Sequence, residues 1–426
     1  MLGNQLYSWA EKLFPLNRSL SGPGNRETLR FLIDQGVPLE IKEFKSGTPV
    51  GDWVVPSEWI IRDAYIESLE GKKIISWKEN NLHVVGYSHP VNMTITLKEL
   101  LPRVYVEESN AKAIPYVTSY YEETWGFCMS QDQLDSIGEG PFHVVIDSYF
   151  LSGSEGGVLN YGEIFIEGKS KQEVIFTSYI CHPSMANNEL SGPVLISALS
   201  KHIQKLNQHY SYRFLLLPET IGSIAYLHEN LQRLKAAVIA GWVVTCIGNS
   251  DNFSYVESRR GNNYADKITK RVLKRYPDSK HYSWLERGSD ERQFGSPNAD
   301  LPFVAISRSL PGHYPEYHTS LDDLKLVNPI ALEESFEFLV SIIGEIECNR
   351  VPRSLFVGEP QLGKRGLRST LSKSDLFDSN MKNVSDILSL CDGQNTIEEL
   401  AMLTNLPFES TTAVIELLHQ HSLIDL

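Results

Sequence analysis

The sequence predicts an α/β fold with a mostly parallel central sheet and helices on both faces, together with an inserted all-β domain and a C-terminal winged helix-turn-helix domain. Three observations carry this prediction. Strand-like runs alternate with helical runs beyond about residue 158, which is typical of a parallel sheet. Short alternating runs separated by turn residues precede them, and helical apolar spacing that ends in a strand-like segment closes the chain. The predicted boundaries are 1–48 and 152–349 for the α/β domain, 49–151 for the insertion, 350–375 for a linker and 376–426 for the winged helix.

Each element of the α/β domain has its own signal. Residues 1 to about 45 carry helical apolar spacing. Apolar, β-branched runs predict the strands, and amphipathic runs between them predict the helices. The predicted strands are 163–168, 173–180, 212–218, 237–247 and 302–309, and the predicted helices are 193–206, 222–234, 263–275 and 329–347. In the insertion the predicted strands lie within 53–68, 72–77, 82–88, 93–100, 113–121, 125–130 and 142–150.

Size, charge and cysteine content limit the class of protein. A chain of 426 residues is long enough for two or three domains. Its net charge of -14 disfavours nucleic acid or an anionic membrane as a partner. The five cysteines are scattered and form no CxxC pair, and the first residues lack the basic start and apolar run of a signal peptide. We expect a cytoplasmic protein that binds neither nucleic acid nor membrane.

The C-terminal helical unit is strongly acidic. Residues 376–426 contain one lysine and eight Asp or Glu residues, so one minus eight gives -7. DNA-binding winged helices need a basic face for phosphate contacts. We therefore expect this unit to dock a protein or to dimerise, and either it or the insertion could form a homo-oligomer.

Polar groups follow several predicted strands of the α/β domain. His182 follows the strand 173–180, and Asn188 and Glu189 stand where the next helix begins. Glu219 follows the strand 212–218 in the segment LLLPETIGS, and His318 follows the strand 302–309. Ligands bind at the carboxyl ends of strands in open α/β sheets. Two imidazoles and carboxylates suit a zinc ion, and a carboxylate that is not a ligand can activate a metal-bound water.

The order of these motifs resembles that of the co-catalytic zinc exopeptidases. HP…ANNELSG, PETIGS and YHTSLDDL are similar to motifs of that clan, which includes bacterial leucyl aminopeptidases. The whole chain is more similar still to bacterial aminopeptidase-like proteins of unassigned activity. These proteins carry a β insertion and a C-terminal winged helix, and their genes often lie with surface-polysaccharide genes. The resemblance implies an aminopeptidase-like fold, zinc and hydrolysis of an amide bond.

Departures from the clan's motifs bear on the number of metal ions. Asn188 stands where the clan has its bridging aspartate, and only one glutamate, Glu219, stands where the clan has two. One zinc ion is therefore favoured over two. We expect His182, His318 and a carboxylate to hold it, with Glu189 the first candidate by proximity in sequence and Asp290 the second. Glu219 then remains as the general base, although it could instead be a ligand.

Four residues are candidate substrate contacts. Asn188, His313 and Tyr317 lie within or beside the motifs. Arg260, which follows a predicted strand together with Arg259, could hold a substrate carboxylate through paired hydrogen bonds.

The leading hypothesis is a zinc-dependent, aminopeptidase-like hydrolase that acts on a small peptide or an acylated or aminoacylated amino sugar. An amidase or deacylase of a surface-polysaccharide precursor has the same chemistry and a different substrate. An inactive ligand-binding scaffold or sensor that docks proteins through its winged helix is the alternative from another class, and Asn188 favours it.

Overall fold

The computed structural model describes residues 2–367 and 379–426. These residues form two compact units, 1–340 and 341–426. The first unit contains the α/β domain and the insertion, and the second contains the C-terminal helices.

The α/β domain is built on an eight-stranded sheet with the order β1-β10-β12-β11-β13-β16-β14-β15. The four central strands β12, β11, β13 and β16 run parallel, whereas β10 pairs antiparallel with β12 and β14 pairs antiparallel with β16. The strands are β1 (Glu40–Lys45), β10 (Val158–Ile166), β11 (Glu173–Tyr179), β12 (Ser211–Leu217), β13 (Val238–Val244), β14 (Ser254–Val256), β15 (Lys280–Tyr282) and β16 (Phe303–Ser307). All seven residues of β11 are buried, as expected for a strand covered on both faces.

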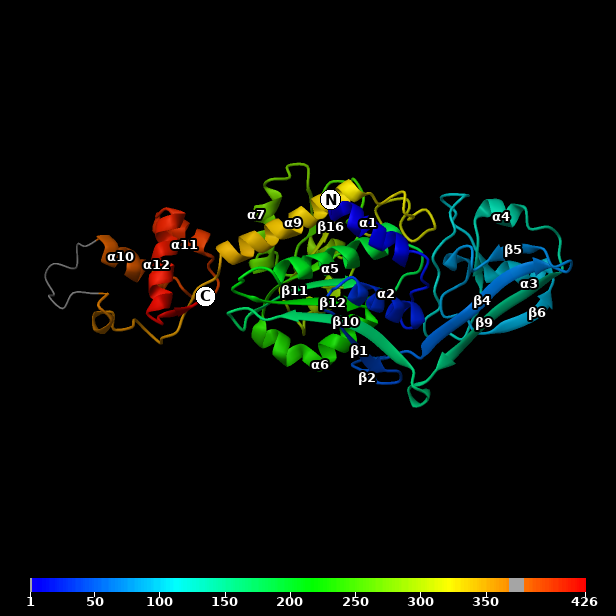
Figure 1. Cartoon of the computed structure of the whole chain (residues 1–426), viewed down its shortest axis with the longest axis horizontal. Coiled ribbons are helices and arrows are strands. Elements are labelled where there is room, and N and C mark those ends of the chain that lie inside the picture. The colour runs from blue at the N-terminus through cyan, green and yellow to red at the C-terminus, as the bar shows by residue number, and fades with distance from the viewer. Residues whose placement is uncertain (1, 368–378) are drawn as a thin grey trace. The chain divides into compact units, whose positions relative to one another are not determined.

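Helices cover both faces of this sheet, and α5 and α6 lie on opposite sides of it (Figure 1). The helices are α1 (Leu2–Leu13), α2 (Pro23–Asp34), α5 (Ser191–Ile203), α6 (Ile221–Ala237), α7 (Tyr264–Leu273), α8 (Glu291–Phe294) and α9 (Pro329–Cys348). The predicted α/β class, with its parallel core and two helical layers, is confirmed.

The prediction of helix up to about residue 45 is wrong for residues 40–45, which form β1. Gly36 has a φ of 76° just beyond α2, a conformation that ends the helix. The sequence EIKEFK then pairs antiparallel with β10 and buries Phe44. Pairing with an existing sheet edge therefore decides the structure of this short segment.

The insertion is centred on a four-stranded antiparallel sheet with the order β5-β4-β9-β6. Its strands are β4 (Glu58–Ser68), β5 (Lys73–Ser76), β6 (Val91–Ile95) and β9 (Phe142–Leu151). Two-residue strands β2 (Pro49–Val50), β3 (Trp53–Val54), β7 (Val104–Tyr105) and β8 (Phe127–Cys128) complete it. Buried residues of this sheet and of the α/β domain belong to one continuous hydrophobic core.

One helix and two loops replace some of the strands predicted in the insertion, and a second helix follows the predicted strand 125–130. The helices α3 (Leu97–Leu100) and α4 (Gln131–Asp135) each begin with a capping box. Segments 82–88 and 113–121 form isolated bridges rather than strands, including one between Pro115 and Thr319 of the α/β domain. The apolar residues of 113–121 therefore cover the α/β domain instead of extending a sheet.

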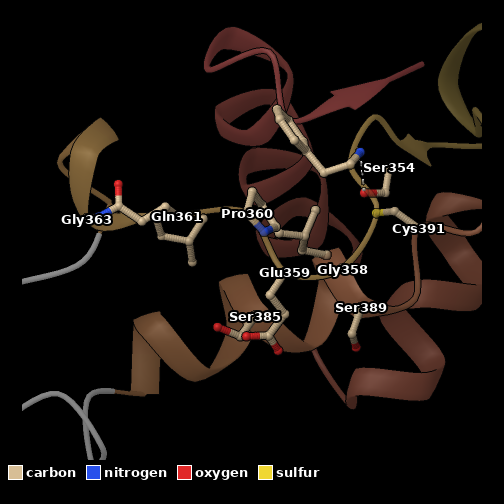
Figure 2. Close-up of a pocket in the computed structure, with 12 residues that line it drawn as sticks. Ser354, Gly358, Glu359, Pro360, Gln361, Gly363, Ser385, Ser389 and Cys391 are labelled. Carbon is tan, nitrogen blue, oxygen red and sulfur yellow. Dashed lines mark hydrogen bonds between the residues drawn. The ribbon is translucent and has the colours of Figure 1, made fainter.

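The C-terminal unit packs three helices against a short antiparallel pair of strands. It contains α10 (Ser379–Ser389), α11 (Ile397–Thr404) and α12 (Phe408–Gln420), with β17 (Arg353–Ser354) paired to β18 (Ile424–Asp425). Part of the predicted linker 350–375 thus contributes a strand to this unit, and residues 368–378 lie outside the described residues. A pocket of about 540 Å³ opens between the segment 354–363 and α10, with Ser385 and Ser389 along one wall (Figure 2).

None of the helices in the described parts of the chain has both the length and the apolar character needed to cross a membrane.

Candidate active site

The candidate site lies where the central parallel strands end. His182 follows β11, Glu219 follows β12, and His318 lies in the loop after β16. Between His182 and α5 the chain makes one turn of π-helix, η4 (Ala186–Leu190), in which every residue is buried. Such turns recur at functional sites because they place side chains that an α-helix would not bring together.

His182 is held by a buried carboxylate and a buried guanidinium. Its Nδ1 lies 2.9 Å from Oε2 of Glu189, and Oε1 of Glu189 lies 3.3 Å from Nε of Arg18. The side chains of Arg18 and Glu189 are fully buried. Because a carboxylate accepts, Nδ1 of the neutral imidazole donates, and the lone pair of Nε2 is left free on the opposite edge of the ring.

His318, Tyr116 and Tyr317 form an aromatic cluster beside His182. The ring centroids of His182 and His318 are 5.2 Å apart, and Tyr116 of the insertion packs edge-on at 5.2 Å from each. Tyr317 stacks on His318 at 3.9 Å. Nε2 of His318 is buried and has no hydrogen-bond partner.

Carboxylates from two further loops complete the cluster. Oε2 of Glu219 lies 3.9 Å from Nε2 of His182, and Oε1 accepts a hydrogen bond from the Ser289 hydroxyl at 3.0 Å. Oδ1 of Asp290 accepts from the backbone N–H of Thr220, the residue after Glu219, at 2.9 Å. Oδ2 of Asp290 is buried and meets no hydrogen-bond criterion with any of the described residues, although the Ser223 hydroxyl is close enough to lower the pKa of this carboxyl.

Burial dominates the protonation of these groups. It raises the pKa of Glu219 to about 8, with the charge of Asp290 acting in the same direction, and it raises the pKa of Asp290 to about 6. It lowers the pKa of both His182 and His318 to about 3, helped by the charge of Arg18 on His182. Both imidazoles are therefore neutral at pH 7, which is the state that binds a metal ion.

Asp322 fixes the turn that carries Asn188 and Glu189. Its carboxylate accepts from the backbone N–H groups of Ala186, Asn187 and Asn188 at 2.6–3.1 Å. The side-chain oxygen of Asn188 accepts from the Tyr179 hydroxyl at 2.6 Å. The amide of Asn188 is thus 1% exposed and already occupied by protein groups, although we had expected it to contact substrate.

Several backbone positions at the site are in the left-handed region. His318 has a φ of 55° and Thr220 a φ of 64°. Such conformations cost on the order of 1–3 kcal/mol at non-glycine residues and cluster at functional sites. These two left-handed residues lie in the loops that follow β12 and β16, the loops that carry Glu219 and His318.

Two buried atoms of this region, Nε2 of His318 and Oδ2 of Asp290, have no hydrogen-bond partner among the described residues. Imidazole nitrogens and carboxylate oxygens are ligands that a divalent cation such as zinc accepts. Among the described residues, Cys181, His182 and Glu189 form the one group of three such side chains whose possible ligand atoms all lie within 4.8 Å of one another. That group is less suitable, because burial raises the pKa of the Cys181 thiol and Arg18 already engages Glu189.

The structure does not bring two of the predicted substrate contacts to this cluster. The guanidinium of Arg260 pairs with Asp300 in an exposed position. His313 is exposed, and its ring lies edge-on to Tyr282 at 6.1 Å. Both residues belong to polar surface loops, and the sequence did not indicate which part of the fold these loops would reach.

Three residues of the site were missed by sequence reasoning. Arg18 and Tyr116 lie far away in the chain and carry no local motif. Asp322 is part of the motif YHTSLDDL, which gave the only available signal for it.

Comparison with known proteins identifies the family. Residues 7–349 match the model of a family described as "Domain of unknown function (DUF4910)", and residues 350–426 match a winged helix-turn-helix model. The chain belongs to the DUF4910 family. It is 41% identical over 427 residues to a Clostridium acetobutylicum protein named "Putative polysaccharide biosynthesis protein with aminopeptidase-like domain", covering 100% of this chain and 96% of that protein.

Solved structures agree with this assignment. The structure of a "putative peptidase" from Clostridium acetobutylicum is 39% identical, with a TM-score of 0.82, and the match covers 100% of this chain and 96% of that one. A zinc aminopeptidase from Bacillus subtilis, 11% identical, matches with a TM-score of 0.56 over 80% of this DUF4910 chain and 94% of its own. At that identity the match shows the fold alone. The predicted aminopeptidase-like fold and winged helix are confirmed.

Proposed function

We propose that this protein is a metal-dependent hydrolase that cleaves an amide bond at the His182–His318 cluster, with zinc as the metal. The observation that carries the proposal is the pair of neutral imidazoles, His182 and His318, with ring centroids 5.2 Å apart and with Oε2 of Glu219 3.9 Å from Nε2 of His182. Nε2 of His182, Nε2 of His318 and Oδ2 of Asp290 are the proposed ligands. A bound zinc ion would polarise the substrate carbonyl and lower the pKa of water.

The other groups of the cluster have distinct proposed roles. Glu219, whose Oε2 lies 3.9 Å from Nε2 of His182, would accept the proton of the attacking water and return it to the leaving nitrogen. A cation held beside Glu219 would lower its pKa, which burial and the charge of Asp290 raise to about 8, and would leave it ionised for this role. The Ser289 hydroxyl holds the other oxygen of Glu219 in place. Glu189 orients His182 rather than binding the metal, which revises our expectation from sequence proximity.

We infer one ion rather than two. A second ion would need a bridging carboxylate, and Asn188 stands at that position with its oxygen bonded to Tyr179. An amide oxygen carries no charge to share between two cations.

The proposed substrates are a small peptide or an acylated or aminoacylated amino sugar. The name of the Clostridium acetobutylicum relative places that protein in polysaccharide biosynthesis, which favours the amino sugar. Both substrates present the same amide bond to the cluster, so the chemistry does not distinguish them.

The test separates the metal ligands from the base. We expect about one zinc ion per chain by mass spectrometry of protein purified without chelators. Glu219→Gln should keep this metal and lose hydrolysis of acyl and aminoacyl amides by about 10²-fold or more. His318→Ala should lose the metal. The exposed residues Glu229 and His313 provide the matched controls Glu229→Gln and His313→Ala, which should change neither.

The outcomes point to different conclusions. If Glu219→Gln empties the site, Glu219 is a ligand and not the base. If the purified protein binds a metal but hydrolyses no amide in a screen, the site is a ligand-binding scaffold. If it binds no zinc, manganese or iron, the hydrolase proposal is wrong.

A further inference from the structure

The insertion contains an aromatic pocket of about 340 Å³ that the proposed chemistry does not use. Its walls include Tyr87, Tyr120, Tyr121 and Phe150. The rings of Tyr87 and Tyr120 meet edge-on at 6.3 Å, and Phe150 lies tilted against Tyr87 at 6.0 Å. The volume is at the lower end of the roughly 300–1,000 Å³ typical of small-molecule sites, so the pocket is suited to one ring-sized group.

The rim of this pocket carries two carboxylates, Glu122 and Glu123. Both are exposed, and within the described parts of the chain no ion pair or side-chain hydrogen bond engages either of them. A pocket for an aliphatic or aromatic side chain would not need paired acceptors at its mouth. Ring faces beside free carboxylates match a ligand with one apolar face and several O–H or N–H donors.

Tyr120 connects the pocket to the candidate active site. It is 37% exposed, so part of its ring faces solvent in the pocket. Tyr120 also lines a small inner cavity together with Tyr116, and burial raises the pKa of its hydroxyl. Tyr116 in turn contacts both His182 and His318. Tyr120 and Tyr116 thus lie between the pocket and the cluster.

Two residues of the pocket have left-handed backbone conformations, which cluster at functional sites. Tyr87 and Tyr120 have φ angles of 65° and 44°, which bulky residues rarely adopt. Each conformation costs on the order of 1–3 kcal/mol. Both residues line this pocket, so the strained backbone and the pocket occur at the same place.

We propose that this pocket binds a pyranose ring of the substrate, with the C–H face of the sugar against the aromatic rings and its hydroxyl or amino groups donating to Glu122 and Glu123. The inference rests on the proposed hydrolase function, since the sugar ring in the pocket would belong to the same substrate as the amide at the cluster. Because Tyr120 and Tyr116 lie between the two places, this ring is a neighbour of the sugar that carries the amide. This assignment selects an amino sugar amide over a peptide as the substrate class.

The test measures sugar binding separately from hydrolysis. The methyl glycosides of glucosamine and N-acetylglucosamine and the peptide Leu-Gly-Gly are titrated into the full chain, with binding followed by saturation-transfer NMR and calorimetry. We expect the glycosides to bind and the peptide not to compete. Glu122→Gln combined with Glu123→Gln should weaken glycoside binding by about tenfold or more, since charge-assisted hydrogen bonds are lost.

Two controls make the outcome specific. Glu108→Gln removes an exposed carboxylate elsewhere in the insertion and should leave binding unchanged. Glu219→Gln should retain glycoside binding while hydrolysis is lost, so the failure of one proposal does not imply the failure of the other. Absence of glycoside binding by the wild-type protein, or full binding by the double variant, would overturn the pocket assignment. Stronger binding of the peptide would show a peptide subsite instead.

Discussion

Replacing Arg18 tests whether the buried charges behind His182 support the site. Arg18 and Glu189 are both fully buried, with Nε and Oε1 3.3 Å apart, and Nη1 of Arg18 also donates to the carbonyl of Leu13 at 2.7 Å. Arg18→Met keeps most of the volume but leaves the Glu189 carboxylate without its partner. Breaking a buried pair in this way costs about 3–5 kcal/mol.

The assay is urea unfolding at pH 7, followed by a probe of the first unit. With a slope of about 3 kcal/mol/M, the midpoint should fall by about 1 to 1.7 M. Arg30→Met, on the exposed face of α2, is the control and should change stability by less than about 0.5 kcal/mol. The double variant Arg18→Met with Glu189→Gln should be more stable than Arg18→Met alone, because no unpaired charge is then buried.

Two results would refute this reasoning. A loss below about 1 kcal/mol for Arg18→Met would show that Glu189 is not held as a carboxylate by Arg18. A double variant whose loss equals the sum of the two single losses would show that the two residues do not interact.

Three further predictions follow from other parts of the molecule. Asp322→Ala removes the acceptor of three backbone N–H groups in the π-helical turn, and we expect a loss of about 3 kcal/mol or more by urea unfolding, whereas Asp323→Ala next to it should have little effect. Burial lowers the pKa of His83, so at this residue the folded state binds fewer protons than the unfolded chain. The free energy of unfolding should therefore fall as the pH drops below about 6.5. His83→Gln should reduce the difference between the urea midpoints measured at pH 7 and at pH 5.5. The acidic winged helix should show no duplex DNA affinity at physiological salt, and salt-sensitive retardation in a mobility-shift assay would contradict this.

The sequence was sufficient to predict the architecture because long apolar runs and their alternation decide it. A strand such as β11, whose residues are all buried, is typical of a parallel sheet that helices cover on both faces. Its position could therefore be predicted from the apolar run alone. Short segments were harder. The segment predicted as helix that forms β1 and the segment 113–121 predicted as strand that forms a loop both take their structure from pairing with the rest of the fold.

For the site, the sequence predicted which strand ends carry chemistry and not which atoms face each other. His182 and Glu219 follow the neighbouring strands β11 and β12, and His318 lies in the loop after β16, which β13 separates from β11 in the same sheet. Glu189 was assigned to the metal because it is near His182 in sequence, whereas the π-helical turn directs it to Nδ1, beside Arg18. That direction depends on a single extra residue in the turn, which no periodicity reveals.

The bonds between the insertion and the loop of His318 have a consequence for how the protein folds. The backbone N–H of Tyr116 donates to the carbonyl of His318 at 2.8 Å, and the N–H of Ile114 donates to the Ser320 hydroxyl at 3.0 Å, across 206 positions of sequence. His318 also has a left-handed backbone that these contacts help to maintain. The loop therefore cannot reach its final conformation until a segment made some two hundred residues earlier has folded, and contacts of such long range form late. We expect the amides of 114–116 and of 318–320 to become exposed to hydrogen exchange in the same opening event. The site would then assemble in the last step of folding and come apart in the first step of unfolding.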